Sequence, residues 1–443
     1  MIDVMEIVRK LERKGASEAE VVMWRNRRFR VSFSEEISDI IDLELISVSL
    51  RVAVNKKIAV IGVEDISSEN IERKIEEIIR IARASSEDPY WRGLNTVFGK
   101  TVVEEIYNKE LDEVSYDDVR DIIRTMVNNV HDVHPKVSVS RGSFNILRTE
   151  YNYANSYSNE ILKRSENSFG GYIWVRADVD NIGTFSDFFI GRSIKKDFDP
   201  AYFSRKVAER SLEFSRARKT TTGKYKIIFE NSVAGSILTS VFSPAVSAET
   251  IFRKRSPLID KIGTQIFDDK ISIVDDGTIG RYIGAREFDD EGHPTQRTIL
   301  VEKGILKTYL YDSYYAKLLN TRSTGNAWRG LASSPRPSHN VLIFEPGDLE
   351  INDLIKEVGR GIYVVRVIGE WLSNPVSGYV QATITHAYEI ENGEIREPLK
   401  GGTLTMNLYE NLKRSFIGAS KETRATPARI VAPSIAVDNV SIS

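Results

Sequence analysis

The stretch from Lys224 to Glu345 constrains the fold of this 443-residue chain more than any other part of it. It opens with an apolar, strand-like run from Tyr225 to Phe229, and a helix-like segment from Ser232 to Thr250 follows. Beyond that segment, acidic residues, glycines and hydroxyl side chains gather more densely than elsewhere. This stretch, with the residue types that it lacks, therefore carries most of the functional information in the sequence.

Carboxylates dominate the loop motif from Phe288 to Gly292. Asp289 and Glu291, with the nearby His293, have the chemistry of a metal site or of an acid–base pair. Gly292 also suits an ordinary acidic turn. Both interpretations stay open at this point, and the turn is favoured.

A second motif, Ser323-Thr324-Gly325-Asn326-Ala327, combines a glycine turn with hydroxyl and amide side chains. Such a loop can hold the main chain or a carboxylate of a ligand, and a tight turn explains the same residues. From these two motifs and the nearby Arg329 we predict six ligand-binding residues. They are Asp289, Glu291, Thr324, Gly325, Asn326 and Arg329.

Hydrophobic periodicity predicts a mixed α+β chain, because helical and alternating patterns both recur. Helices are expected over residues 3–14, 68–84, 115–134, 198–217, 232–250, 312–320, 351–358 and 408–417. Strands are expected over residues 20–24, 28–34, 43–54, 57–63, 137–140, 144–151, 160–177, 225–229, 274–285, 298–309, 340–344, 362–368, 378–390, 402–406 and 433–443. The polar segment 218–223 predicts a boundary between an N-terminal domain, 1–220, and a C-terminal domain, 221–443.

Composition excludes several classes of function. The 61 basic and 63 acidic residues give a net charge of -2, which argues against binding of nucleic acid or anionic membranes. The sequence has no apolar run of about 20 residues and no signal-peptide layout at its start, so a soluble cytoplasmic protein is expected. Without any cysteine, disulfides, thiolate metal sites and cysteine nucleophiles are excluded. The 28% of charged residues hints at a thermophilic, archaeal-type source.

Common catalytic fingerprints are also missing. The chain has no Walker-type phosphate loop, no dinucleotide glycine fingerprint and no Gly-x-Ser-x-Gly elbow. The five histidines are scattered, and most suit helix ends, turns or strands.

Six short motifs, in order, resemble the TldD/PmbA family. They are Asp275-Asp276-Gly277-Thr278, Phe288 to Gly292, Leu300 to Leu306, Ser323 to Ala327, Pro335 to Asn340, and Glu345-Pro346-Gly347. The closing Ala432-Pro433-Ser434-Ile435 and the segment 51–83 also fit, so the resemblance covers nearly the whole chain. It implies an N-terminal sheet-and-helix domain followed by a mostly antiparallel, barrel-like C-terminal β domain.

The family has two branches, and one of them is a metallopeptidase with a His-Glu-x-x-x-His helix and a cysteine as third ligand. The matching window here, Thr239 to Pro244, contains no histidine or glutamate. Positions five apart on a regular helix point about 140° away from each other, so the active motif needs a distorted helix. Pro244 would keep such a distortion while the ligands are lost.

The resemblance therefore implies the PmbA/TldE-like branch: a non-catalytic subunit with no catalytic or metal-binding residues of its own. Its expected partner is a TldD-like metallopeptidase that carries the zinc and degrades or processes unfolded peptides. The family is also known under the name modulator of DNA gyrase, but the charge balance gives no support to direct DNA contact. Two alternatives stay open, a homodimeric peptide-binding scaffold and a hydrolase built on Asp289, Glu291 and His293.

Overall fold

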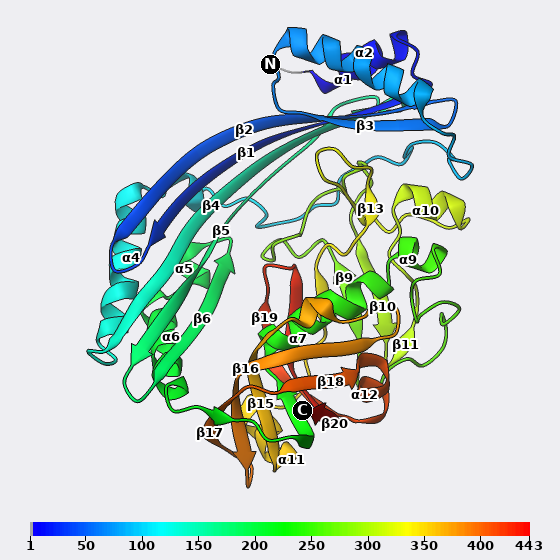
Figure 1. Cartoon of the computed structure of the whole chain (residues 1–443). Helices are drawn as coiled ribbons and strands as arrows, with labels where there is room; N and C mark the ends of the chain where they lie inside the picture. The colour runs from blue at the N-terminus through cyan, green and yellow to red at the C-terminus, as the bar shows by residue number, and fades with distance from the viewer. Residues whose placement is uncertain (1–2) are drawn as a thin grey trace.

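Two β-sheets, one from each half of the chain, organise the fold (Figure 1). The structure is a computed structural model that describes residues 3–443. The first sheet lies within residues 18–191, and the second within residues 218–442. The α+β class and the mostly antiparallel C-terminal β domain are confirmed.

The N-terminal sheet is a long, curved arch of six antiparallel strands in the order β3-β2-β1-β4-β5-β6. Their bounds are β1 Glu18–Phe33, β2 Ile37–Val54, β3 Lys57–Val63, β4 Val137–Asn155, β5 Leu162–Asp178 and β6 Ile182–Gly191. Because β3 pairs only with Val48–Val54, the outer edge of β2 before Val48 has no neighbouring strand among residues 3–443.

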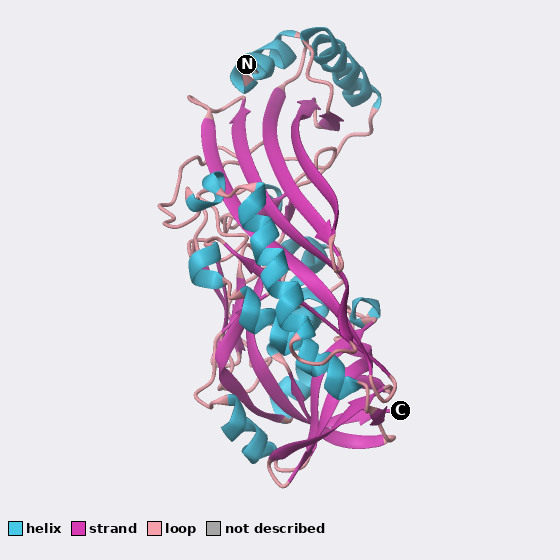
Figure 2. Cartoon of the chain, turned by 90° about the vertical axis from the view of Figure 1, so that its left-hand side faces the viewer, coloured by secondary structure: helices cyan, strands magenta, loops and turns pink. Residues whose placement is uncertain are grey.

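Helices cover the two ends of this arch (Figures 1 and 2). At one end α1, Val4–Arg13, and α2, Ser68–Ala84, share one apolar core with the strands. At the other end lie α4, Tyr116–His131, and α6, Pro200–Phe214, with the short helices α3, Glu110–Glu113, and α5, Ile194–Asp197. Burial of each large apolar side chain in these cores contributes about 1.5–3 kcal/mol.

The start of α4 shows how the sequence sets a helix boundary. Ser115 accepts a hydrogen bond from the Asp118 backbone N–H at 3.2 Å, and the Asp118 carboxylate accepts one from the Ser115 N–H at 2.8 Å. This reciprocal capping box satisfies two backbone donors that the first turn leaves free. Val119, Ile123 and Met126 then follow at helical spacing and are buried.

The C-terminal sheet contains a closed barrel of five strands. β20 pairs with β8, β8 with β15, β15 with β16, β16 with β18, and β18 again with β20. Their bounds are β8 Gly223–Phe229, β15 Gly361–Ile368, β16 Tyr379–Glu391, β18 Thr403–Asn407 and β20 Ile430–Ile442. Within this ring only the β8–β15 pair is parallel.

The remaining strands extend the sheet away from the barrel. They are β7 Arg218–Lys219, β9 Ile273–Asp276, β10 Arg297–Glu302, β11 Ile305–Leu306, β14 Leu342–Phe344, β17 Glu394–Lys400 and β19 Phe416–Ala425. β12, Ala327–Trp328, and β13, Arg336–Pro337, form a separate pair. The helices of this half are α7 Asn231–Ile237, α8 Ser243–Ala245, α9 Ala248–Phe252, α10 Ser313–Leu318, α11 Ile351–Val358 and α12 Leu408–Arg414.

Several predicted boundaries were wrong. The strand expected over 274–285 ends at Asp276, because the Asp276 carboxylate accepts hydrogen bonds from both the backbone and the hydroxyl of Thr278 and closes a turn. The strand over 298–309 is split by a turn at Lys303 and Gly304. The helix over 408–417 ends at Arg414, and β6 and β17 were not predicted at all.

The long strands of the arch were underestimated in length. The runs predicted over 20–24 and 28–34 form the single strand β1, and those over 137–140 and 144–151 form β4. Exposed polar residues in the middle of β1 interrupt the apolar pattern but not the pairing. None of the helices within residues 3–443 combines the length and the apolar composition needed to cross a bilayer.

Candidate functional site

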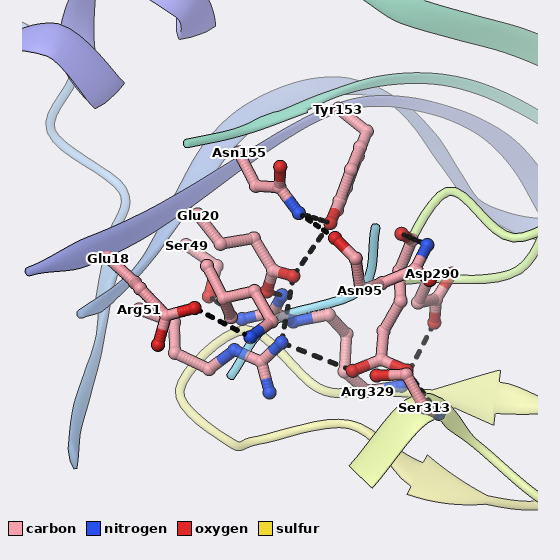
Figure 3. A network of polar contacts seen from close by, with 12 residues as sticks. Glu18, Glu20, Ser49, Arg51, Asn95, Tyr153, Asn155, Asp290, Ser313 and Arg329 are labelled. Atoms are coloured by element: carbon pink, nitrogen blue, oxygen red, sulfur yellow. Dashed lines mark hydrogen bonds and ion pairs between the residues drawn. The ribbon is translucent and has the colours of Figure 1, made fainter. Parts of the chain in front are cut away.

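The acidic loop motifs lie at the junction between the arch and the C-terminal loops (Figure 3). Arg51 of β2 places Nη2 2.8 Å from the Glu20 carboxylate and 3.2 Å from that of Glu291. All three side chains are almost fully buried. Burial opposes charge on Glu20, but the charges of Arg51 and Arg329 outweigh it and lower the pKa of Glu20.

Arg329 completes this junction from the C-terminal side. Its side chain is fully buried and forms an ion pair with Glu20, and its Nη2 donates to the Ser49 hydroxyl at 2.9 Å. Tyr153 donates its hydroxyl hydrogen to Glu20 at 2.9 Å. Residues from both halves thus converge on one buried carboxylate, which ties the loop motifs to the arch.

Asp289 and Glu291 hold the loop together and tie it to its neighbours. Asp289 accepts backbone N–H hydrogen bonds from Glu291 at 2.9 Å, His293 at 3.0 Å and Ala327 at 3.0 Å. Burial and the neighbouring Glu291 charge raise the pKa of Asp289 to about 6. Glu291 accepts from Arg51 and, at 2.9 Å, from the Ser313 N–H.

The Ser-Thr-Gly-Asn-Ala turn is equally internal. Thr324 exchanges hydrogen bonds with the Tyr311 backbone, and Asn326 donates to the Asp275 carboxylate at 2.6 Å. Burial raises the pKa of Asp275 to about 7. Gly325 has φ +72°, and a Cβ there would lie 2.4 Å from the Pro294 carbonyl oxygen, so only glycine fits this close approach.

The structure therefore brings the six predicted residues into one region, but inside the protein. Each of the side chains, and the backbone of Gly325, is engaged with other groups of the same chain. Their role in peptide binding stays a prediction. The alternative set of Asp289, Glu291 and His293 lies in the same turn. Both carboxylates of this set already accept hydrogen bonds from other groups of the chain.

A second region, the segment predicted as a helix over 232–250, is a broken helix. α7 ends at Ile237, a π-helical turn spans Leu238–Phe242, and α8 and α9 continue after it. Within the π-turn the Ser243 N–H bonds to the Leu238 carbonyl, five residues back. The distortion inferred from sequence thus occurs within the window from Thr239 to Pro244, and such turns are frequent at functional sites.

The two faces of this helix differ sharply. Val233, Ile237, Val241 and Phe242 are buried in the barrel-side core. On the other face, side chains with hydroxyl groups are only half-buried, and they are Ser236, Thr239, Ser240 and Ser243. This asymmetry leaves one polar helix face open to a neighbouring cavity.

His339 lies against the end of the π-turn. Its Nε2 is 2.8 Å from the Ala428 carbonyl oxygen, which requires a hydrogen on that nitrogen. Its Nδ1 therefore accepts the hydroxyl hydrogen of Ser243, at 2.6 Å. Burial, together with the charge of Arg429, lowers the pKa of His339 to about 3, so the ring is neutral and both nitrogens are occupied.

Comparisons with known proteins place these features in a family. Residues 222–443 match the model described as the PmbA/TldA metallopeptidase C-terminal domain, which is half of the chain. The chain belongs to the PmbA/TldD family.

Relatives agree with this assignment, and a solved structure shares the fold. An uncharacterised protein of Methanocaldococcus jannaschii is 36% identical over 52% of this chain and 54% of its own. A metalloprotease PmbA homolog of Haemophilus influenzae is 31% identical over 58% and 54%. These alignments span about half the length of each relative. The structure of TldE from Thermococcus kodakarensis has a TM-score of 0.89 and 24% identity over the full length of both chains, which shows the shared fold.

Zinc is the metal that the metallopeptidase branch of the PmbA/TldD family implies, and the side chains of the π-turn do not fit it. Zinc sites use cysteine, histidine, aspartate or glutamate ligands. The window from Thr239 to Pro244 offers hydroxyls, apolar groups and a proline. His339, the nearest histidine in contact with the turn, uses both ring nitrogens in hydrogen bonds. Across residues 3–443 no three acidic or histidine side chains meet as a metal-binding group.

A cavity of about 350 Å³ adjoins the open face of this helix. Its walls come from α7 and the π-turn, from the end of β15 with the 3₁₀ turn Glu370–Leu372, and from the loop between β19 and β20. Its size lies within the usual range for small-molecule or peptide sites. We take it as the candidate functional site of this PmbA/TldD protein.

The sequence did not predict two residues of this cavity, Glu370 and Trp371. Gly369, with φ +86°, ends the preceding strand in a left-handed conformation. Trp371 and Leu372 then remain exposed, by 63% and 76%. Two large apolar residues that begin two positions after a glycine at the end of a strand were the available signal.

Proposed function

We propose that this chain is the non-catalytic, TldE-like subunit of a peptidase complex, in which a TldD-type partner of the same family supplies zinc and hydrolysis. The observation that carries the proposal is the π-turn over Leu238–Phe242. It keeps a distorted helix beside a cavity where the catalytic branch of the family needs one, but with hydroxyl and proline side chains in place of metal ligands.

Two further observations support this proposal. The carboxylates that could replace the missing site, Asp289 and Glu291, are fully buried and already bonded to other groups of the same chain. In the described part of the chain, the outer edge of β2 before Val48 has no neighbouring strand, and Ile40, Leu43 and Leu45 of this segment are exposed. Exposed apolar residues on an open strand edge are typical of a surface that associates with another chain.

Reconstitution tests the proposal. The purified chain, a TldD-type protein with the His-Glu-x-x-x-His motif from the same source, and their mixture would each be incubated with zinc and an unstructured peptide. We expect the two proteins to co-elute in size-exclusion chromatography and the mixture to cleave the peptide faster than the partner alone. The chain by itself should not cleave.

Two outcomes would contradict the proposal. Cleavage by the chain alone that disappears in Glu291→Gln and His293→Ala would support the hydrolase alternative. A homodimer that binds peptide but does not associate with the TldD-type protein would support the scaffold alternative. Glu357→Gln, at an exposed position on α11, is the matched control for the first of these variants.

A further inference from the structure

The cavity beside the π-turn presents mainly hydrogen-bond acceptors on its helix wall. The hydroxyls of Ser236, Thr239 and Ser240 donate to the carbonyls of Val233, Gly235 and Ser236, at 3.0, 2.8 and 3.0 Å. Since each hydroxyl hydrogen is used inside the helix, the oxygen lone pairs are what these residues offer to the cavity.

A carboxylate completes the polar side of the cavity. Glu370 lies in its wall, and its Oε2 is buried without a hydrogen-bond partner among residues 3–443. Buried carboxylate oxygens are normally paired, and one that is not marks a place for a missing donor. Burial also raises the pKa of Glu370, so a bound positive charge would relieve the cost of ionising it.

Arg366 lines the cavity, and it shares a single carboxylate, Asp187, with Arg424. Its charge also acts to lower the pKa of Glu370, but burial outweighs that effect. Arg366 places Nη2 2.5 Å from the Asp187 carboxylate and 2.7 Å from the Ser186 carbonyl, and Nε also bonds to Ser186. Arg424 pairs with the same Asp187 at 2.9 Å. Neither arginine is within ion-pair distance of Glu370 in the described part of the chain.

An aromatic side chain lines the same cavity as the carboxylate. Trp371 follows Glu370 in the chain and is 63% exposed, and Val233, Val367 and Pro427 line the cavity with it. An indole ring attracts a cation at its face, and the aliphatic groups beside it suit a short apolar stem. The same cavity thus combines acceptors, one carboxylate and an aromatic wall.

We propose that this cavity binds an ammonium group carried on a peptide, with Glu370 as its counter-ion, Trp371 against its face and the hydroxyls of the π-turn helix as acceptors. An ammonium has three donors and no acceptor, which complements this wall. The group can be the amino terminus of a peptide or a lysine side chain. The inference rests on the proposed function only for the choice of peptides as carriers of the ammonium group.

Calorimetric titration of the full chain with three probes tests the inference. The first is alanyl-leucinamide, which has a free amino terminus. The second is its N-acetylated form, which has no positive charge, and the third is N-acetyl-lysinamide, whose only ammonium is on the side chain. We expect the first or the third probe to bind at least tenfold more tightly than the second. Binding of the first identifies a peptide amino terminus as the source, and binding of the third identifies lysine.

Variants then assign the binding to the cavity. Glu370→Gln should weaken the tighter probe at least tenfold, and Trp371→Ala by a few-fold. Glu357→Gln, at an exposed position on α11 that does not line the cavity, should leave the affinity unchanged. Circular dichroism verifies that each variant is folded.

Three results would overturn the inference: equal affinity for the acetylated probe, unchanged affinity in Glu370→Gln, or no binding by any charged probe. The probe comparison uses the unaltered protein, so it stands even if a variant fails to fold. Since no partner protein is added, a failure here leaves the proposed subunit function untouched, and a failure to assemble with a TldD-type protein leaves this binding result untouched.

Discussion

The buried junction around Glu20 and the cavity beside the π-turn differ in how they use polar groups. In the junction Glu20 and Glu291 are each held by arginines together with a tyrosine hydroxyl or a backbone N–H group of the same chain. In the cavity, one oxygen of Glu370 has no hydrogen-bond donor among residues 3–443, and the hydroxyls of the helix wall donate within their own helix. The difference teaches that the densest polar motifs of this sequence stabilise the fold, whereas the candidate site is built from inconspicuous serines and threonines.

Removal of a charge from the junction should have the largest effect on stability. Arg51→Met would leave Glu20 and Glu291 with less compensation in a fully buried place. We expect a loss of about 3–5 kcal/mol in the free energy of unfolding, measured by urea denaturation. Arg414→Met, which removes an exposed helix pair with Glu410, should change little. If Arg51→Met lost no more stability than that control, the claim that the junction stabilises the fold would be wrong.

A substitution in the glycine turn at Gly325 should have the second-largest effect on stability. Gly325→Ala forces a residue with a side chain into positive φ and places its Cβ against the Pro294 carbonyl. Strain and overpacking together predict a loss of about 2 kcal/mol or more. Thermal unfolding measures it, with Gly330→Ala as control because Gly330 has neither a positive φ nor a backbone atom in the way. Equal melting temperatures for the two variants would contradict this account.

The pH dependence of the free energy of unfolding tests the buried turns further. The pKa of Asp275 is about 7 in the folded protein and about 3.8 in its ordinary state. Between these values the folded protein keeps a proton that the unfolded chain has lost, so stability falls as pH rises from about 4 to 7. One such carboxyl contributes a slope of up to about 1.4 kcal/mol per pH unit.

Asp275→Asn should flatten this slope in urea unfolding measured across that range of pH. Asp289, whose pKa is also raised by burial, acts in the same direction and leaves a residual slope. Asp353→Asn on the exposed side of α11 is the control. An unchanged slope in Asp275→Asn would show that this carboxyl is ionised in the folded protein.

The smallest effect on stability is expected on the cavity side. Ser240→Ala removes a hydroxyl that donates within its own helix, and such bonds contribute little to helix stability. Alanine is also the better helix former, so we expect a change below about 0.5 kcal/mol in urea unfolding. The adjacent Val241→Ala, from a fully buried position, should cost about 2 kcal/mol. Equal losses would show that the open face is part of the core.

Much of the fold was predictable because hydrophobic periodicity and helix capping depend on residues close in sequence. The apolar spacing of α2 and the start of α4 at Ser115 are both set by neighbouring residues. The lengths of β1 and β4 were not predictable, since exposed residues in their middle are held by pairing with partners more than 100 positions away. Closure of the barrel through β18 and β20 likewise depends on distant pairing, and only the family resemblance suggested it.

The candidate site was predictable only in part. The broken helix followed from the spacing of a motif and from Pro244, and the structure contains it. The cavity needed Glu370 and Trp371, which lie some 130 residues further along the chain and carry no motif. The prediction fell on the acidic turns instead, because a sequence shows which residues are polar but not which of them form hydrogen bonds inside the protein.

The π-turn also affects how this region can diverge. One inserted residue gives such a turn, and one deletion would restore a regular helix. Each residue of a regular helix rotates the next by about 100°, so a deletion would turn Ser243 and the segment beyond it by that angle relative to α7. Ser243 would then lose its place against His339. Descendants of this chain can therefore exchange side chains on the helix more readily than they can change its length.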